Sequence, residues 1–75
     1  MITIKSRRWL DREEFLEVLK IADYIGSENG RAVFRFNFEK ALKNNYGYED
    51  VVVLIQEYGL DVDEKELVKI REMYD

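Results

Sequence analysis

The chain has 75 residues and a net charge of −4, and it contains neither cysteine nor histidine. The absence of these two residue types excludes disulfides, thiolate nucleophiles, cysteine-ligated zinc or iron–sulfur sites, and the commonest general base. With 47% apolar and 13% aromatic residues, the composition is typical of a single folded domain over residues 1–75.

Charge is divided unevenly along the chain. Residues 1–45 carry nine Lys and Arg against seven Asp and Glu, whereas residues 46–75 carry three against nine. Such an asymmetry indicates two surfaces with different partners. No apolar segment is long enough to span a bilayer and no leader-like segment opens the sequence, so we expect a cytoplasmic protein without a membrane partner.

The first part of the sequence predicts a strand followed by a helix. Residues 2–9 begin with alternating β-branched residues, which is typical of a strand. Asp11 followed by Glu14 three residues later predicts a helix start. Apolar residues continue as far as Ile25, and Gly26 is the expected C-cap.

A second strand is predicted after a turn. Residues 27–30 contain an Asn-Gly pair, and residues 32–38 alternate strictly between large apolar and other side chains. A strand, a helix and a strand in this order favour a parallel βαβ unit, although antiparallel placement also fits.

The remaining residues predict helices, a short one at about 39–44 and longer ones at about 49–58 and 64–74. Gly59 is placed to end the middle helix, and Asp63 to begin the last one. The expected fold class is therefore α+β, with a small two-stranded, βαβ-like sheet packed against three to four helices.

Six basic and aromatic residues form the first candidate site: Lys5, Arg7, Arg8, Trp9, Arg31 and Arg35. If the two strands are neighbours, Lys5, Arg7 and Arg35 share the sheet face that points away from the core, with Arg31 at its margin. Cationic side chains bind phosphates and an aromatic ring stacks on bases, so this set is a candidate site for DNA or RNA. The structural alternative is that Trp9 anchors the core while the basic residues pair with nearby acids.

A second candidate surface lies in the C-terminal half. Tyr46 and Tyr48 flank a glycine between two predicted helices, where aromatic rings can contact a partner or simply cover the edge of the core. Val52 and Val53 lie off the apolar stripe of their helix, which fits a partner contact or an ordinary exposed valine. These four residues are candidates for contact with a protein partner or a second copy of the chain.

No catalytic or cofactor motif is present, neither a phosphate-binding glycine loop nor a nucleophile elbow. Asp61, Asp63 and Glu72 have the spacing of three calcium ligands in an EF-hand, but Glu66 stands where that loop requires glycine. We therefore expect a non-enzymatic protein that uses no cofactor and no metal.

Two segments resemble accessory domains of superfamily 2 helicases. These are residues 31–36 (RAVFRF) and residues 50–60 (DVVVLIQEYGL). With the order of predicted elements, they resemble the DNA-damage-recognition domain of archaeal XPB-like helicases and the HARP-type domain of annealing helicases. The resemblance implies DNA contact by a domain that assists a motor carried elsewhere, because this chain has no helicase motifs.

Our first hypothesis is therefore a non-catalytic nucleic-acid-associated module, such as a DNA-binding accessory domain of a helicase or repair complex. The alternative is a protein-interaction or self-assembly module that uses a sheet edge, the Val52/Val53 helix face or the acidic C-terminal helices. Clustered basic residues beside an exposed Trp9 would favour the first hypothesis. Dispersed basic residues and an exposed apolar helix face would favour the second.

Overall fold

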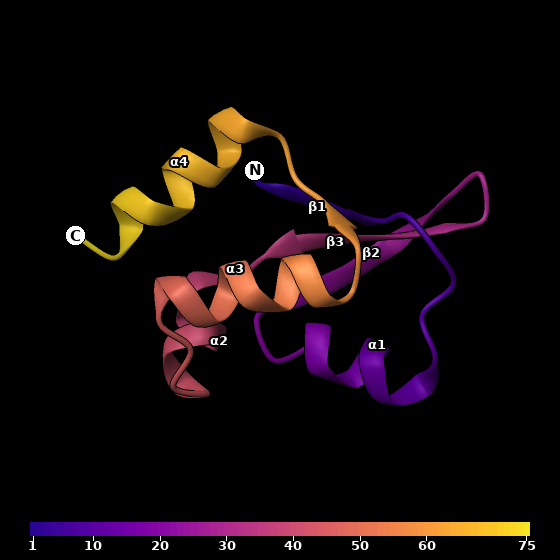
Figure 1. Ribbon diagram of the computed structural model, residues 1–75, viewed down its shortest axis with the longest axis horizontal. Coiled ribbons are helices and arrows are strands. Elements are labelled where there is room, and N and C mark those ends of the chain that lie inside the picture. The colour runs from indigo at the N-terminus through magenta and orange to yellow at the C-terminus, as the bar shows by residue number, and fades with distance from the viewer.

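Four strands and four helices make up the computed structural model, which describes residues 1–75 (Figure 1). In chain order they are β1 (Thr3–Ser6), α1 (Arg12–Val18), β2 (Ala22–Glu28), β3 (Arg31–Phe36), α2 (Phe38–Lys43), α3 (Tyr48–Glu57), β4 (Leu60–Asp61) and α4 (Glu64–Met73). The chain is thus an α+β domain, and the three helices predicted in its second half are confirmed. None of the helices is both long enough and apolar enough to cross a membrane.

The four strands form one antiparallel sheet with the order β2-β3-β1-β4. The predicted two-stranded, βαβ-like sheet is therefore wrong in its number of strands and in its direction. The neighbours β1 and β3 are antiparallel, with Thr3 opposite Arg35 and Lys5 opposite Val33. The reason is that β2 intervenes between α1 and β3, so that the chain enters β3 through a hairpin and not through a crossover helix.

The helix predicted to reach Ile25 is also wrong, because α1 ends at Val18 and Leu19 is its C-cap. The following segment forms β2, which turns into β3 through Asn29 and Gly30. Both turn residues have positive φ values, 53° and 77°, as the tight turn of a two-residue hairpin requires. Gly26 does not cap a helix: it lies in β2 next to an irregularity in the pairing with β3, with φ at 142°.

Polar side chains fix where the helices begin. Asp11 accepts a hydrogen bond from the Glu14 amide and the Glu14 side chain accepts from the Asp11 amide, so the predicted capping box is confirmed. Asp63 caps α4 by accepting from the Lys65 amide. The Glu66 carboxylate, in the first turn of α4, accepts a hydrogen bond from the amide of Thr3 at 3.4 Å. This bond connects α4 to β1.

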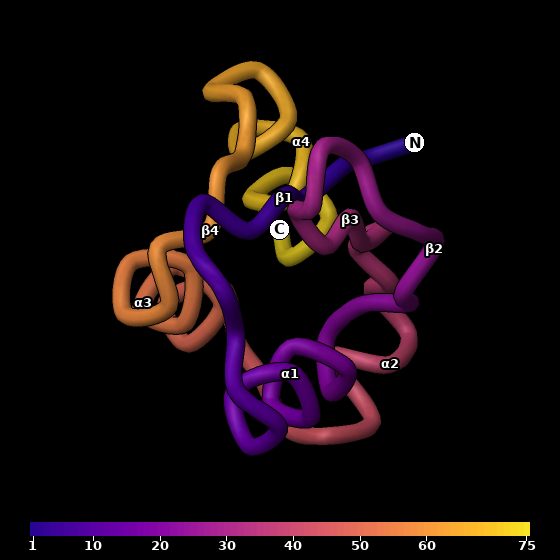
Figure 2. Tube along the Cα trace, turned by 90° about the vertical axis from the view of Figure 1, so that its right-hand side faces the viewer, coloured from indigo at the N-terminus to yellow at the C-terminus, as the bar shows by residue number.

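The core lies between the sheet and helices α1, α2 and α3, which cover one of its faces (Figures 1 and 2). Ile4, Val18 and Phe34 are fully buried there. Helix α4 lies at the end of the sheet opposite the β2–β3 turn, and Tyr74 after its end packs edge-on against the ring of Phe38 at 4.9 Å. The opposite face of the sheet has no helix layer, and its charged side chains lie at the surface.

Candidate nucleic-acid interface

The open face of the sheet carries Lys and Arg side chains on its two central strands and Asp and Glu side chains on its two edge strands. Cross-strand partners share a face of a sheet, and the observed register places Lys5 and Arg35 on the same side. The ion pairs on this side are Lys5–Glu28 at 3.3 Å, Arg7–Asp61 at 3.4 Å, Arg31–Asp61 at 3.7 Å and Arg35–Asp23 at 3.1 Å. The structure therefore brings four of the six candidate residues together, but as an ion-paired surface.

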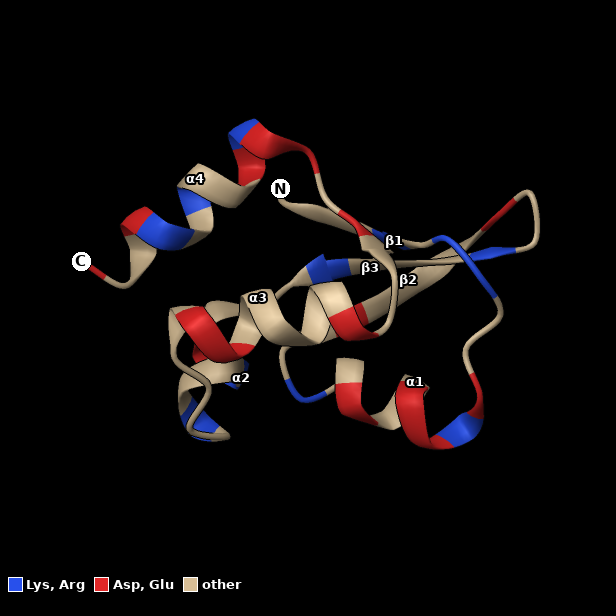
Figure 3. Cartoon of the chain, viewed as in Figure 1, with Lys and Arg blue, Asp and Glu red and all other residues tan.

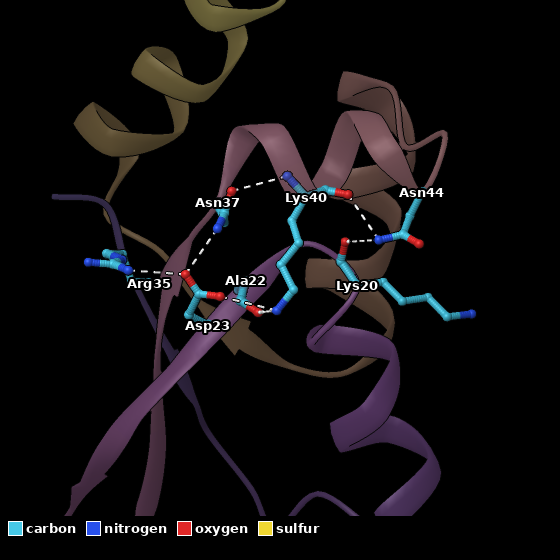
Figure 4. A network of polar contacts seen from close by, with 7 residues as sticks. All are labelled: Lys20, Ala22, Asp23, Arg35, Asn37, Lys40 and Asn44. Atoms are coloured by element: carbon cyan, nitrogen blue, oxygen red, sulfur yellow. Dashed lines mark hydrogen bonds and ion pairs between the residues drawn. The ribbon is translucent and has the colours of Figure 1, made fainter.

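Arg35 belongs to a dense polar network at one end of this face. Arg35, Asn37 and Lys40 converge on the carboxylate of Asp23, at 3.1, 3.0 and 3.1 Å (Figure 4). The hydrogen bond from Asn37, then those from Arg35 and Lys40, lower the pKa of Asp23 from 3.8 to about 2. Lys40 also donates to the carbonyl of Ala22 at 2.8 Å. The network links β2, β3 and α2, so Arg35 has a structural role.

Arg31 is also used within the fold. Its Nε donates to the carbonyl of Ser6 at 2.6 Å, next to the bond in which the Ser6 hydroxyl accepts the amide of Ala32 at 3.0 Å. These bonds extend the pairing of β3 with the end of β1. The guanidinium terminus of Arg31 reaches the surface, where its side chain is 39% exposed.

Trp9 is 84% exposed in the segment between β1 and α1, so the alternative in which it anchors the core is wrong. Leu10 takes the inward position and is 9% exposed. The segment is held by the capping box and by Arg8, which donates to the carboxylate of Glu14 and to the carbonyl of Trp9. The Arg8 hydrogen bond, together with that of the Asp11 amide, lowers the pKa of Glu14. The arrangement turns the indole ring outward.

Arg12 joins this end of the molecule, although the sequence reasoning missed it. It is the first residue of α1, is exposed and makes no ion pair within 4.0 Å. The sequence signal that could have identified Arg12 is its position three residues after Trp9, at the predicted helix start. We call Arg7, Arg8, Trp9, Arg12 and Arg31 the Trp9 end, in which Arg7 and Arg31 lie on the side of the open sheet face, where both pair with Asp61. In Figure 3 the blue segments of the loop after β1, of the start of α1 and of the start of β3 lie along the right-hand side of the molecule, with red segments among them.

The four residues predicted to contact a partner have different environments. Burial and a hydrogen bond to Glu17 at 2.9 Å raise the pKa of Tyr46 to about 12, and its carbonyl accepts from Tyr74. Tyr48 packs against the ring of Tyr74 at 6.5 Å. Both tyrosines thus have contacts within the fold, as the structural alternative expected. Val52 is half-buried. Val53 is 50% exposed and is the only exposed residue of the four.

No group of three or more carboxylates has the arrangement that would hold a metal ion. Comparisons with protein-family models, with curated proteins and with solved structures find no match to this chain. The resemblance to helicase accessory domains therefore stays a prediction.

Proposed function

We propose that this chain is a non-catalytic module that binds single-stranded nucleic acid at the Trp9 end. The observation that carries the proposal is the 84% exposure of Trp9, whose ring contacts no other aromatic ring. Exposing so large an apolar ring to water is unfavourable unless a ligand covers it. Bases of any sequence can stack on such a ring, which is how single strands are held without sequence readout.

The arginines around Trp9 supply the phosphate contacts in this proposal. Arg12 has no ion pair, and the side chains of Arg7 and Arg8 are 65% and 47% exposed. Exposed ion pairs contribute only about 0–1 kcal/mol, so a phosphate oxygen can replace Asp61 as the partner of Arg7 at small cost. The net charge of −4 opposes long-range attraction of a nucleic acid, and we therefore expect weak, strongly salt-dependent binding.

The test is fluorescence anisotropy of a labelled eight-nucleotide single strand, of DNA and of RNA, at about 50 and 200 mM salt. We expect saturable binding that weakens with salt. Arg7→Gln and Arg12→Gln should each reduce the slope of log affinity against log salt by about 1, because each removes one phosphate contact. The matched control is Lys69→Gln on the exposed surface of α4, which should leave the slope unchanged. Binding that does not respond to salt, or equal slopes in all variants, would contradict the proposal.

A second candidate function, self-association, is favoured by the outer edge of β2. This edge strand pairs only with β3, and its central residues Tyr24 and Ile25 are 46% and 45% exposed. An antiparallel β2 from a second copy would bring Glu28 of each chain towards Lys20 of the other, which gives charge complementarity. The irregular pairing at Ile25 opposes a regular added strand, so this function ranks second.

Sedimentation equilibrium between about 10 and 500 μM would measure this self-association, in the range expected of weak edge pairing. Dimers that Ile25→Lys abolishes and Val68→Ala leaves unchanged would support it. A monomer over the whole range would rule it out.

A further inference from the structure

A pocket of about 420 Å³ opens beside Trp9, between α1 and the underside of the β2–β3 hairpin. Its apolar lining includes Trp9, Phe15, Leu16, Tyr24 and Ala32. Leu16 and Tyr24 are 49% and 46% exposed, so the apolar surface continues from the pocket to its rim. The volume lies in the range of pockets that hold small planar ligands.

The inner wall of the pocket is fixed by aromatic packing. Phe15 contacts the ring of Tyr24 at 5.2 Å and that of the buried Phe34 at 5.3 Å, and Tyr24 contacts Phe34 at 5.8 Å. The Tyr24 hydroxyl is further bonded to the hydroxyl of Ser27 at 2.8 Å. Because these rings hold one another, the pocket is formed before any ligand arrives, and binding would cost little ordering of its inner wall.

A polar group in the lining of the pocket has unused hydrogen-bonding capacity. The hydroxyl of Ser6, a residue only 2% exposed, lines the pocket and accepts the amide of Ala32 at 3.0 Å. The hydroxyl proton itself makes no hydrogen bond within the protein, so it can be donated to a ligand. A ligand with a hydrogen-bond acceptor on a flat ring would accept this proton.

The charges at the rim indicate what such a ring is attached to. Arg8 and Arg12 line the pocket and are exposed, and Arg12 makes no ion pair. A planar group with hydrogen-bond acceptors, joined to an anion, matches the apolar lining, the Ser6 hydroxyl and the two arginines together. We propose that the pocket receives one base of a bound single strand, with an adjacent phosphate at Arg12. This inference rests on the proposed function and adds to it a specific contact, the insertion of one base into the pocket.

The experiment compares two eight-nucleotide strands of equal charge, one carrying thymine at each position and one without bases. Anisotropy at about 50 mM salt gives the ratio of their affinities for the wild-type protein. Base stacking predicts that the strand without bases binds tenfold or more weakly. Because the two strands carry the same phosphates, this ratio does not depend on the arginines.

Variants then separate the pocket from the exposed face of Trp9. Ser27→Phe places a ring in the pocket and should reduce the ratio to the part that stacking on the exposed face of Trp9 provides. The matched Ser27→Ala leaves the pocket open and should keep the wild-type ratio. Ser6→Ala should weaken binding of the strand with bases about fivefold, as loss of one hydrogen bond predicts, and leave the strand without bases unaffected. Because Ser6→Ala also frees the Ala32 amide, circular dichroism must first show that it is folded.

The outcomes distinguish this inference from the proposed function. Salt-dependent binding with an unchanged ratio in Ser27→Phe would overturn the pocket inference and leave binding at the Trp9 end standing. Equal affinities for the two strands would overturn the pocket inference together with base stacking on Trp9. Failure of both strands to bind would overturn the pocket inference and the proposed function. If, in addition, a peptide with one phenylalanine between two glutamates quenches Trp9 fluorescence, the pocket belongs to a protein partner.

Discussion

The two ends of the β2–β3 hairpin, the polar network around Asp23 and the Trp9 end, use the same kinds of side chain in opposite ways. At one end, Arg35 and Lys40 are held against Asp23, whose pKa falls to about 2. At the other end, Trp9 is 84% exposed and Arg12 makes no ion pair. Polar groups that are bonded within the fold contribute to its stability, whereas groups without partners remain able to bind a ligand. The network end should therefore control stability, and the Trp9 end should control binding.

The largest effect should come from Phe34, which the two ends share. It lies on β3 between Ala32 at the pocket and Arg35 in the network, and it is fully buried. Phe34→Ala should lower the free energy of unfolding by about 3–5 kcal/mol, because a large cavity remains, and in so small a domain this loss can unfold it. Urea denaturation followed by circular dichroism measures the change. A loss below about 1 kcal/mol would show that the core is not closed around this ring.

Trp9→Ala should separate the two ends most clearly. We expect nucleic-acid affinity to fall tenfold or more, because a stacking platform is lost, while the free energy of unfolding changes by less than about 0.5 kcal/mol. Val68→Ala is the matched control, since Val68 is 56% exposed on α4 and should change neither quantity. A large loss of stability in Trp9→Ala would mean that the indole ring packs against the fold.

Asn37→Ala should give the reverse result at the network end. Asn37 accepts from the amide of Lys40 as the N-cap of α2 and donates to Asp23. Losing both bonds should cost about 1–2 kcal/mol of stability without altering nucleic-acid affinity. Asn37→Ser keeps a capping hydroxyl and should recover part of the loss. Equal losses in the two variants would assign the whole effect to the bond with Asp23.

The pH dependence should be the smallest effect. The pKa of Asp23 is about 2 in the folded chain and 3.8 when unperturbed, so the unfolded chain takes up a proton at higher pH than the folded one. The stability from this network is complete above about pH 4 and is lost as the pH falls towards 2. Urea denaturation midpoints of wild type and of Asp23→Asn are therefore compared at pH 7, 4 and 2.5. The difference between the two proteins should be largest at pH 7 and should shrink as the pH falls. A difference that stays constant with pH would contradict this assignment.

The sequence predicted those parts of the fold that have local signals. The Asp11–Glu14 capping box, the alternation before Phe36 and the helical spacing after Phe38 all correspond to observed elements. The strand β2 was missed because its apolar residues continue the period of the preceding helix, and Asn29-Gly30 was interpreted as a turn between a helix and a strand and not as the turn of a hairpin. The two-residue strand β4 has too few residues to form a pattern.

The candidate site was predictable in its composition but not in its pairing. Alternation along the strands was enough to place Lys5 and Arg35 on one face. No local rule shows that Asp23 and Asp61, distant in sequence from their partners, would neutralise that face. The exposure of Trp9 also depends on a tertiary detail, because Leu10 and not Trp9 takes the inward position.

The most direct test of the central claim is a titration of ¹⁵N-labelled protein with the eight-nucleotide single strand, followed through its amide and indole NMR signals. We expect saturable shifts at residues 7–12, at the indole of Trp9 and around Tyr24 to Ala32, with little change at Asn37 and Lys40. Shifts centred on the open sheet face around Arg35, or no shifts at millimolar strand concentration, would contradict this expectation.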